Sequence, residues 1–273
     1  MSYFIAGGTK NTDVKRRAIE IFEGLVPITC HKELVADTDG SYAHCHVCNK
    51  VIGDKLIEQD GTNSWLLLVG APVLEFQTDK DWQGFADEYF TDPKKVLRNK
   101  IDGHFSVIAY DSTKGIFYIA SDWHSLIPTY YAITEYGPLI CSAELPLAKI
   151  LQRKPDKFGF AQAIHNGVVW GERTRFKGVY KLEPCVLVQI DSSNNVRKER
   201  YWEPANETIW KGTFDEIMQR WLTVMRETIR TFTDNRCDAG VSSDLTGGED
   251  SRLVVALLHD IGLSFCVRVA GEP

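Results

Sequence analysis

A run of small and hydroxyl-bearing residues near the end of the chain has the composition of an anion-binding loop. Residues 245–251 read Leu-Thr-Gly-Gly-Glu-Asp-Ser and lie between an apolar segment and an apolar helical pattern. In a strand–loop–helix arrangement, the N–H groups of the loop and of the first helical turn converge on one point, which favours an anion. Thr246, Gly247 and Gly248 lack the bulk that would keep a ligand away from this backbone.

Asp250 and Ser251 fall in the first turn of the predicted helix. A carboxylate beside phosphate groups is favourable when Mg²⁺ lies between them, because bare like charges repel each other. No Gly-Lys-Ser/Thr follows the glycines, so the segment is not a Walker A loop. The alternative interpretation is a Gly-rich turn that binds nothing.

The elements around this loop form one βαβ unit with a preceding helix. Thr213 and Glu216 have the spacing of a capping box and predict a helix over residues 214–232. The unit itself is predicted as a strand at 239–245, a helix at 250–260 ended by Gly262, and a strand at 263–269. One such unit cannot cover both faces of a parallel sheet. We therefore expect the chain to be truncated relative to a working protein, or completed by another chain.

The part of the chain before residue 205 is rich in predicted strands. Its predicted elements are a strand at 1–9, a helix from Asn11 or Thr12 to Leu25, an apolar strand at 65–70, and two strand pairs, 103–111 with 116–122 and 185–190 with 196–202. A polar linker follows at 203–207. Two domains are predicted, residues 1–205 and 206–273.

Composition limits the class of protein. The chain has 273 residues, 44% of them hydrophobic, and a net charge of −6. That charge argues against nucleic acid as a partner. No apolar stretch approaches the roughly 18 residues of a membrane span, and the N-terminus has no signal-peptide pattern. We expect a soluble, cytoplasmic protein that does not bind membranes.

Seven cysteines are spread along the chain, and three of them lie within two positions of a histidine. Cys30, Cys45 and Cys48, with His31, His44 and His46, offer ligand types that zinc prefers. Residues 42–51 also read as a strand, on which Cys45 and Cys48 would point to opposite faces. Buried thiols are the favoured interpretation, and zinc binding remains the alternative.

The loop at 245–251 resembles the Ser-Gly-Gly-x-Asp-Ser pyrophosphate loop of ATP-pyrophosphatase domains, and most closely that of the asparagine synthetase family. Those enzymes adenylate a carboxylate with ATP and let an amine displace AMP. The resemblance implies ATP and Mg²⁺ as cofactors. It implies that Thr246, Gly247, Gly248 and Ser251 hold the β,γ-phosphates, that Asp250 acts there directly or through Mg²⁺, and that Leu245 and Val267 flank the adenine.

The first domain resembles the N-terminal glutaminase domain of the same family, so that the resemblance covers most of residues 97–271. The matching segments are residues 101–111, 122–131 (with Ser125 in place of Gly), 142–144, 176–184 and 200–202. The implied fold is α+β: an Ntn-type αββα sandwich followed by the first βαβ unit of an adenine nucleotide α-hydrolase-like domain. The family's second acidic Mg²⁺ segment would lie beyond Pro273.

Three departures from the family pattern remove the glutaminase machinery. Ser2 stands where the family has its nucleophilic Cys, and Val69-Gly70 stands where it has the oxyanion-hole Asn-Gly. The glutamine-binding Arg-Gly and Gly-Ser-Asp segments have no counterpart. A degenerate glutaminase beside a retained ATP loop resembles the branch with β-lactam synthetases and lasso-peptide cyclases. Two interpretations of Ser2 remain: it is an Ntn nucleophile, or it is a small residue at the start of a strand.

The sequence therefore predicts an ATP-dependent, AMP-forming amide-bond ligase, with Asp250 as its catalytic and metal-binding residue. Its expected partners are a small-molecule or peptide carboxylate and either a second copy of the chain, in a homodimer, or a different partner chain. The alternatives are a glutamine- or ammonia-dependent asparagine synthetase, a hydrolase that works through Ser2, and a non-catalytic protein whose sandwich binds a partner.

Overall fold

The computed structural model describes residues 2–25, 32–38, 40–47, 53–74, 82–204, 211–234 and 240–269. The chain divides into two compact units, Met1–Glu203 (unit 1) and Pro204–Pro273 (unit 2). In the described part of the chain, no helix combines the length and the apolar character needed to cross a membrane.

Unit 1 contains two antiparallel sheets of six strands each. The first sheet has the order β10-β8-β9-β1-β3-β2 and consists of β1 (Tyr3–Gly8), β2 (Lys32–Thr38), β3 (Ser41–Val47), β8 (Tyr130–Thr134), β9 (Gly137–Cys141) and β10 (Tyr180–Lys181). The second has the order β12-β11-β7-β6-β5-β4 and consists of β4 (Lys55–Glu58), β5 (Trp65–Leu74), β6 (Ile101–Asp111), β7 (Ile116–Ser121), β11 (Val186–Ile190) and β12 (Val196–Arg200).

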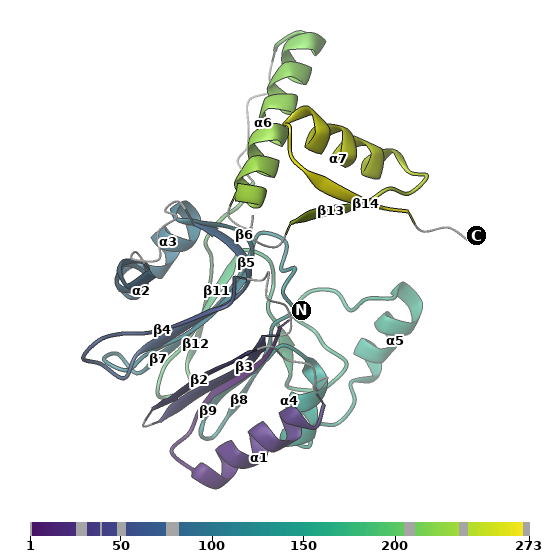
Figure 1. Cartoon of the computed structure of the whole chain (residues 1–273). Coiled ribbons are helices and arrows are strands. Elements are labelled where there is room, and N and C mark those ends of the chain that lie inside the picture. The colour runs from purple at the N-terminus through teal and green to yellow at the C-terminus, as the bar shows by residue number, and fades with distance from the viewer. Residues whose placement is uncertain are drawn as a thin grey trace. The chain divides into compact units, whose positions relative to one another are not determined.

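Helices cover the outer face of each sheet, so that unit 1 is an αββα sandwich (Figure 1). Helices α1 (Thr12–Glu23) and α4 (Glu144–Ile150) pack on the first sheet, and α2 (Trp82–Thr91) and α3 (Pro93–Asn99) pack on the second. A further helix, α5, spans Lys157–Asn166. The four predicted layers are confirmed by this packing.

Strand β5 shows why the layers stack in this way. Successive side chains on a strand point to opposite faces, so Leu67 enters the core between the sheets while Leu66 faces the helices α2 and α3. Both faces are covered by other elements, and the apolar run at its start is buried throughout, as its composition predicts. Trp65 adds a polar link between the sheets, since its indole N–H donates to Ser41 Oγ at 2.9 Å.

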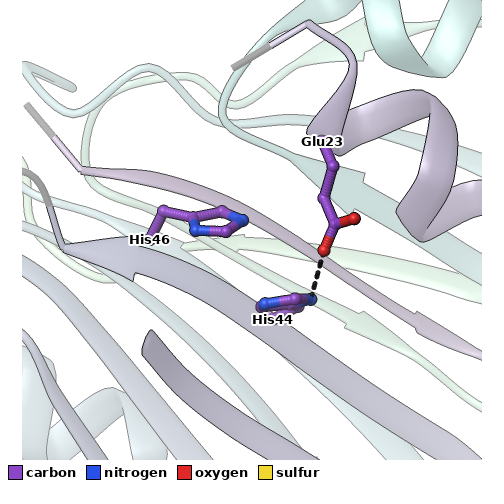
Figure 2. Close-up of side chains that lie close together, drawn as sticks. All are labelled: Glu23, His44 and His46. Atoms are coloured by element: carbon purple, nitrogen blue, oxygen red, sulfur yellow. Dashed lines mark ion pairs between the residues drawn. The ribbon is translucent and has the colours of Figure 1, made fainter. Parts of the chain in front are cut away.

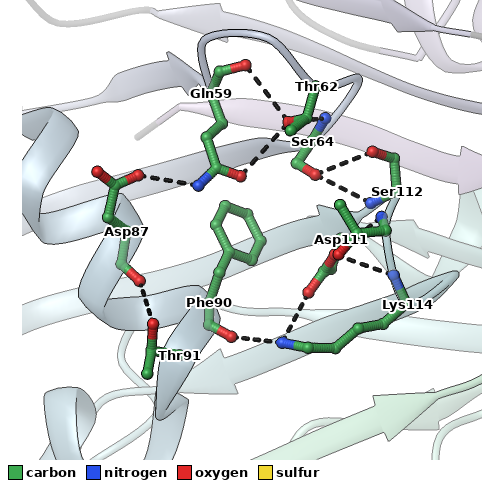
Figure 3. A network of polar contacts seen from close by, with 10 residues as sticks. Gln59, Thr62, Ser64, Asp87, Phe90, Thr91, Asp111, Ser112 and Lys114 are labelled. Atoms are coloured by element: carbon green, nitrogen blue, oxygen red, sulfur yellow. Dashed lines mark hydrogen bonds and ion pairs between the residues drawn. The ribbon is translucent and has the colours of Figure 1, made fainter.

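The turn between β6 and β7 is held by a polar network that reaches α2 (Figure 3). Asp111 Oδ1 accepts from the N–H groups of Thr113 (3.0 Å) and Lys114 (3.1 Å). Lys114 Nζ pairs with Asp111 Oδ2 at 2.9 Å and donates to the carbonyl of Phe90 at 2.5 Å. One carboxylate therefore shapes the turn and, through Lys114, ties it to the end of α2.

Unit 2 contains the predicted lead-in helix and βαβ unit. Helix α6 (Phe214–Asp234) begins with the predicted capping box: Glu216 N–H donates to Thr213 Oγ1 at 3.3 Å, and Thr213 N–H donates to Glu216 Oε2 at 2.7 Å. Strands β13 (Val241–Asp244) and β14 (Phe265–Arg268) are parallel neighbours joined by α7 (Glu249–Asp260). Part of the predicted linker, residues 205–207, lies outside the described residues.

Candidate functional site

The loop that the sequence singles out leaves the sheet of unit 2 at the carboxyl end of β13. Leu245 N–H donates to the carbonyl of Arg268 at 2.8 Å, which extends the pairing with β14 by one residue. The loop proper therefore begins at Thr246. In parallel sheets the carboxyl ends of neighbouring strands share one edge, and that edge is where α/β folds bind ligands.

Two hydroxyl groups close this loop onto the first turn of α7. Thr246 Oγ1 lies 3.0 Å from Ser251 Oγ, and Thr246 N–H donates to the same Ser251 oxygen at 3.1 Å. Gly248 N–H donates to Thr246 Oγ1 at 3.2 Å. The structure thus brings together three of the predicted phosphate-binding residues. Thr246, which stands where the resembling loops have Ser, supplies the hydroxyl that makes these contacts.

The local fold does not require the two glycines of the loop. Neither Gly247 nor Gly248 adopts a positive φ, and a Cβ added to Gly247 would meet no atom within 4 Å. Gly248 is the N-cap of α7, where its lack of a side chain leaves the first-turn N–H groups without the usual capping acceptor. The glycines therefore leave an open, donor-rich backbone that a ligand can approach closely.

Asp250 lies in the first turn of α7 and is exposed to solvent. Among the residues that the structure describes, no hydrogen bond or ion pair of its carboxylate is found. Carboxylate oxygens are the ligands that Mg²⁺ prefers, so Asp250 fits a magnesium ion placed beside phosphates.

The two residues predicted to flank an adenine lie on neighbouring strand ends. Leu245 is half-buried and lines a groove with Leu253 and Phe265, whereas Val267 is exposed and pairs in register with Ser243. Arg252 also lines this groove, and its Nε donates to the carbonyl of Gly248 at 3.3 Å. Arg252 was not among the predicted site residues, although its place in the first turn of the predicted helix put it next to the loop.

In unit 1, Ser2, the residue weighed above as a nucleophile, is held by a carboxylate. Ser2 is buried, with 2% of its surface exposed, and its hydroxyl donates a hydrogen bond to Asp54 Oδ2. The other oxygen of Asp54 accepts the Gly70 N–H at 2.7 Å. Burial raises the pKa of Asp54, while the hydrogen bonds from Ser2 and Gly70 act in the opposite direction. Ser2 therefore has a specific partner, which the sequence did not indicate.

The backbone at the predicted oxyanion position is fixed and engaged. Gly70 has φ +114°, and a Cβ there would lie 2.4 Å from the carbonyl oxygen of His104, so glycine is needed for the close strand approach. Its N–H is taken by Asp54, and the preceding Val69 is buried in the core between the sheets. This arrangement offers no exposed donor to an oxyanion at Val69-Gly70.

The cysteine–histidine motif is divided between two faces of β3. Cys45 is fully buried in the core between the sheets, whereas His44 and His46 lie on the other face beside α1. A zinc site that combines Cys45 with either histidine is therefore wrong, because adjacent strand residues point in opposite directions. Cys30, His31 and Cys48 lie outside the described residues.

Comparisons with known proteins give only distant likenesses. No protein-family model matches the chain. A search of curated proteins also found no match. Similar solved structures include a glutamine phosphoribosylpyrophosphate amidotransferase from B. subtilis complexed with ADP and GMP (TM-score 0.47, 11% identity). They also include an allosteric regulatory enzyme of purine biosynthesis (TM-score 0.40, 11% identity). In both cases the alignment covers 98% of this chain, which spans 65% of the other chain's length. Neither likeness is close enough to assign a function.

Proposed function

We propose that the protein is an ATP-dependent, AMP-forming amide-bond ligase similar to the asparagine synthetase family, with a first unit that has lost glutaminase activity. The observation that carries the proposal is the loop at the carboxyl edge of β13. There Thr246 and Ser251 place two hydroxyls 3.0 Å apart beside two glycines that the fold itself does not require.

The residues of this loop have the donors that a pyrophosphate group needs. The first-turn N–H groups of α7 have no side-chain cap, and they lie at the positive end of the helix dipole, so they can donate to a bound anion. Thr246 and Ser251 add hydroxyl donors, which exchange their mutual contact for phosphate oxygens when ATP binds. These contacts strengthen as negative charge develops on the departing pyrophosphate, which lowers the barrier to carboxylate adenylation.

Asp250 is the proposed magnesium ligand at this site. Bound Mg²⁺ would neutralise phosphate charge next to the carboxylate. The exposed position of Asp250 in the first turn of α7 leaves its oxygens available for this role. Leu245 is proposed to contact one face of the adenine from the groove that it lines, with Val267 on the neighbouring strand.

The geometry of unit 1 supports a reaction that does not use glutamine hydrolysis. Ser2 is buried with its hydroxyl donated to Asp54, and the Gly70 N–H is engaged by the same carboxylate. The amine would then come from the substrate itself or from free ammonia. A small-molecule or peptide carboxylate is the proposed acceptor of the adenylate.

ATP–pyrophosphate exchange against a panel of carboxylic acids tests this proposal. Asp250→Ala is the informative variant, and Glu249→Ala is its matched control, because both are exposed acidic residues in the first turn of α7. Exchange that is lost only in Asp250→Ala supports the ligase. Aspartate as the preferred acid indicates a synthetase, and another acid indicates the cyclase branch. No exchange, together with no ATP binding by calorimetry, contradicts the proposal and favours the partner-binding alternative.

A further inference from the structure

Two histidines share the outer face of β3 in unit 1. His44 and His46 are two residues apart on the strand, so their side chains leave the same face of the sheet. Their rings stack at a centroid distance of 4.7 Å and an interplanar angle of 29°. Both side chains are about nine-tenths buried, at 11% and 10% exposed. The close stacking and the burial of these two imidazole rings together suggest that they share one role.

Carboxylates approach this pair from two sides. Glu23, the last residue of α1, places Oε1 3.7 Å from His44 Nδ1 (Figure 2). Glu33 on β2 pairs in register with His46, and its two oxygens lie 3.5 Å from His46 Nδ1 and 3.7 Å from His44 Nε2. Ligand atoms of Glu23, His44 and His46 all lie within 4.8 Å of one another.

Ion pairing alone accounts poorly for this arrangement. Burial lowers the pKa of His44, and His46 lowers it further, whereas Glu23 and Glu33 raise it. The carboxylate oxygens also lie 3.5–3.7 Å from the ring nitrogens, which is longer than a charge-assisted hydrogen bond of about 2.7–2.9 Å. In addition, His44 Nε2 is buried and has no hydrogen-bond partner within 3.5 Å among the described residues. Imidazole nitrogens and carboxylate oxygens are ligand types that zinc prefers.

We propose that Glu23, His44 and His46 form a binding site for a divalent transition-metal ion, with zinc as the preferred ion. His44 ligates through Nδ1, which faces Glu23, and His46 through Nε2, because Glu33 occupies its Nδ1 side. Glu33 then orients the rings from behind, as carboxylates commonly do for metal-bound histidines. Three protein ligands leave a fourth tetrahedral position for water.

The distances are compatible with closure around an ion. Tetrahedral zinc with bonds of about 2.0–2.1 Å places its ligand atoms about 3.3 Å apart. The three ligand atoms here lie within 4.8 Å, so small side-chain rotations bring them to that spacing. Glu23 has 47% of its side chain exposed and is the ligand best able to move.

The test is metal binding to the full chain after removal of bound metal with a chelator. Zn²⁺ affinity is measured by calorimetry, and Co²⁺ is then used as a spectroscopic probe. We expect one tight zinc ion at this site, and about a tenfold or greater loss of affinity in Glu23→Gln and in His46→Gln. Glu20→Gln is the matched control, because Glu20 is also an exposed glutamate on α1. It should bind zinc as the unaltered chain does.

The cobalt spectrum distinguishes this site from one built on cysteines. The proposed ligands predict tetrahedral d–d bands without a sulfur-to-cobalt charge-transfer band. Such a band, or zinc affinity that is unchanged in both Glu23→Gln and His46→Gln, would overturn the proposal. Glu23 is exposed, so Glu23→Gln is expected to fold, which circular dichroism checks independently of metal binding.

Discussion

The Ser2 hydroxyl donates a hydrogen bond to one oxygen of Asp54, whose other oxygen accepts the Gly70 N–H at 2.7 Å. A single carboxylate therefore joins the start of the chain to strand β5. Ser2 is almost fully buried, and each polar group of this cluster satisfies another. Such a cluster contributes to stability, and it takes up the Gly70 N–H, which is therefore not free to donate to an oxyanion.

Replacing Ser2 with Ala should lower stability without affecting ligase chemistry. The half-buried Asp54 carboxylate loses a donor, which costs about 1–3 kcal/mol in the free energy of unfolding. Urea denaturation measures this loss, and a double-mutant cycle with Asp54→Asn isolates the Ser2–Asp54 coupling. Glutamine hydrolysis that is present in the unaltered protein and abolished by Ser2→Ala would instead establish the N-terminal nucleophile.

Gly247→Ala should separate ligand binding from folding. The added Cβ meets no protein atom within 4 Å, and the backbone there has no positive φ, so stability should stay within about 1 kcal/mol. The methyl group would occupy the space in which we propose that phosphate approaches the loop. ATP affinity measured by calorimetry should fall about tenfold or more.

Gly84→Ala is the matched control for that variant. Gly84 lies in α2, where an added Cβ also meets nothing within 4 Å. This change should leave ATP affinity unaltered and slightly raise the stability of the helix. If Gly247→Ala binds ATP as tightly as Gly84→Ala does, the loop is not a phosphate site.

Elements with local signals were predictable from the sequence. Asn11 caps α1 as expected, with its side chain accepting from the N–H groups of Asp13 and Val14. The capping box at Thr213 and the Thr246–Ser251 loop also depend on residues only a few positions apart. In such cases the residues that determine the geometry lie close together in the chain, so the sequence pattern predicts the local structure.

Helices in unit 1 that lack a clear apolar stripe were missed. Helix α2 carries Gly84 and buries Phe85, Ala86, Tyr89 and Phe90, a grouping that also suits a strand. Helix α4 contains Pro146 near its start, which weakens a helical pattern. The Asp92–Pro93 start of α3 was a usable signal, since Asp caps this helix and Pro occupies its first turn.

The polar clusters of unit 1 could not be derived from spacing. Asp54 reaches Ser2 across 52 positions of the sequence, and the pairing depends on the register of both sheets. The i, i+2 spacing of His44 and His46 did place them on one face, but Glu23 and Glu33 come from other elements. Contacts of this kind follow from tertiary packing, which a single sequence does not encode locally.

Gly70→Ala tests the strand geometry beside Asp54. With φ +114° and the His104 carbonyl oxygen 2.4 Å from the added Cβ, the variant must shift β5 or β6. We expect a loss of roughly 2–4 kcal/mol in unfolding free energy, because backbone strain and a steric clash add together. Thermal denaturation of Gly70→Ala and of Gly84→Ala, carried out side by side, measures the difference in their stability. Equal stability of the two variants would contradict the described pairing of β5 with β6.

Acid should remove the contribution of Asp111 to stability. Burial alone would raise the pKa of Asp111, but hydrogen bonds from Thr113 and Lys114 and the charge of Lys114 outweigh it and hold the pKa below its ordinary value. A carboxylate with a lowered folded-state pKa stabilises the protein fully above its unfolded pKa of about 3.9, and loses that contribution as the pH falls through the folded value.

The comparison of Asp111→Asn with the unaltered protein isolates this effect. Between about pH 5 and pH 7 the variant should be less stable than the unaltered protein by about 1–2 kcal/mol. The effect is modest because Lys114 is partly exposed, so that solvent screens its pairing with Asp111. Below about pH 4 the difference should shrink, because Asp111 in the unfolded chain takes up a proton first, and the folded side chain follows at its lower pKa and then loses its charge-assisted bonds. Urea denaturation of both proteins at several pH values measures this difference in stability. A difference that stays constant or grows on acidification would show that the charge of Asp111 does not hold the β6–β7 turn.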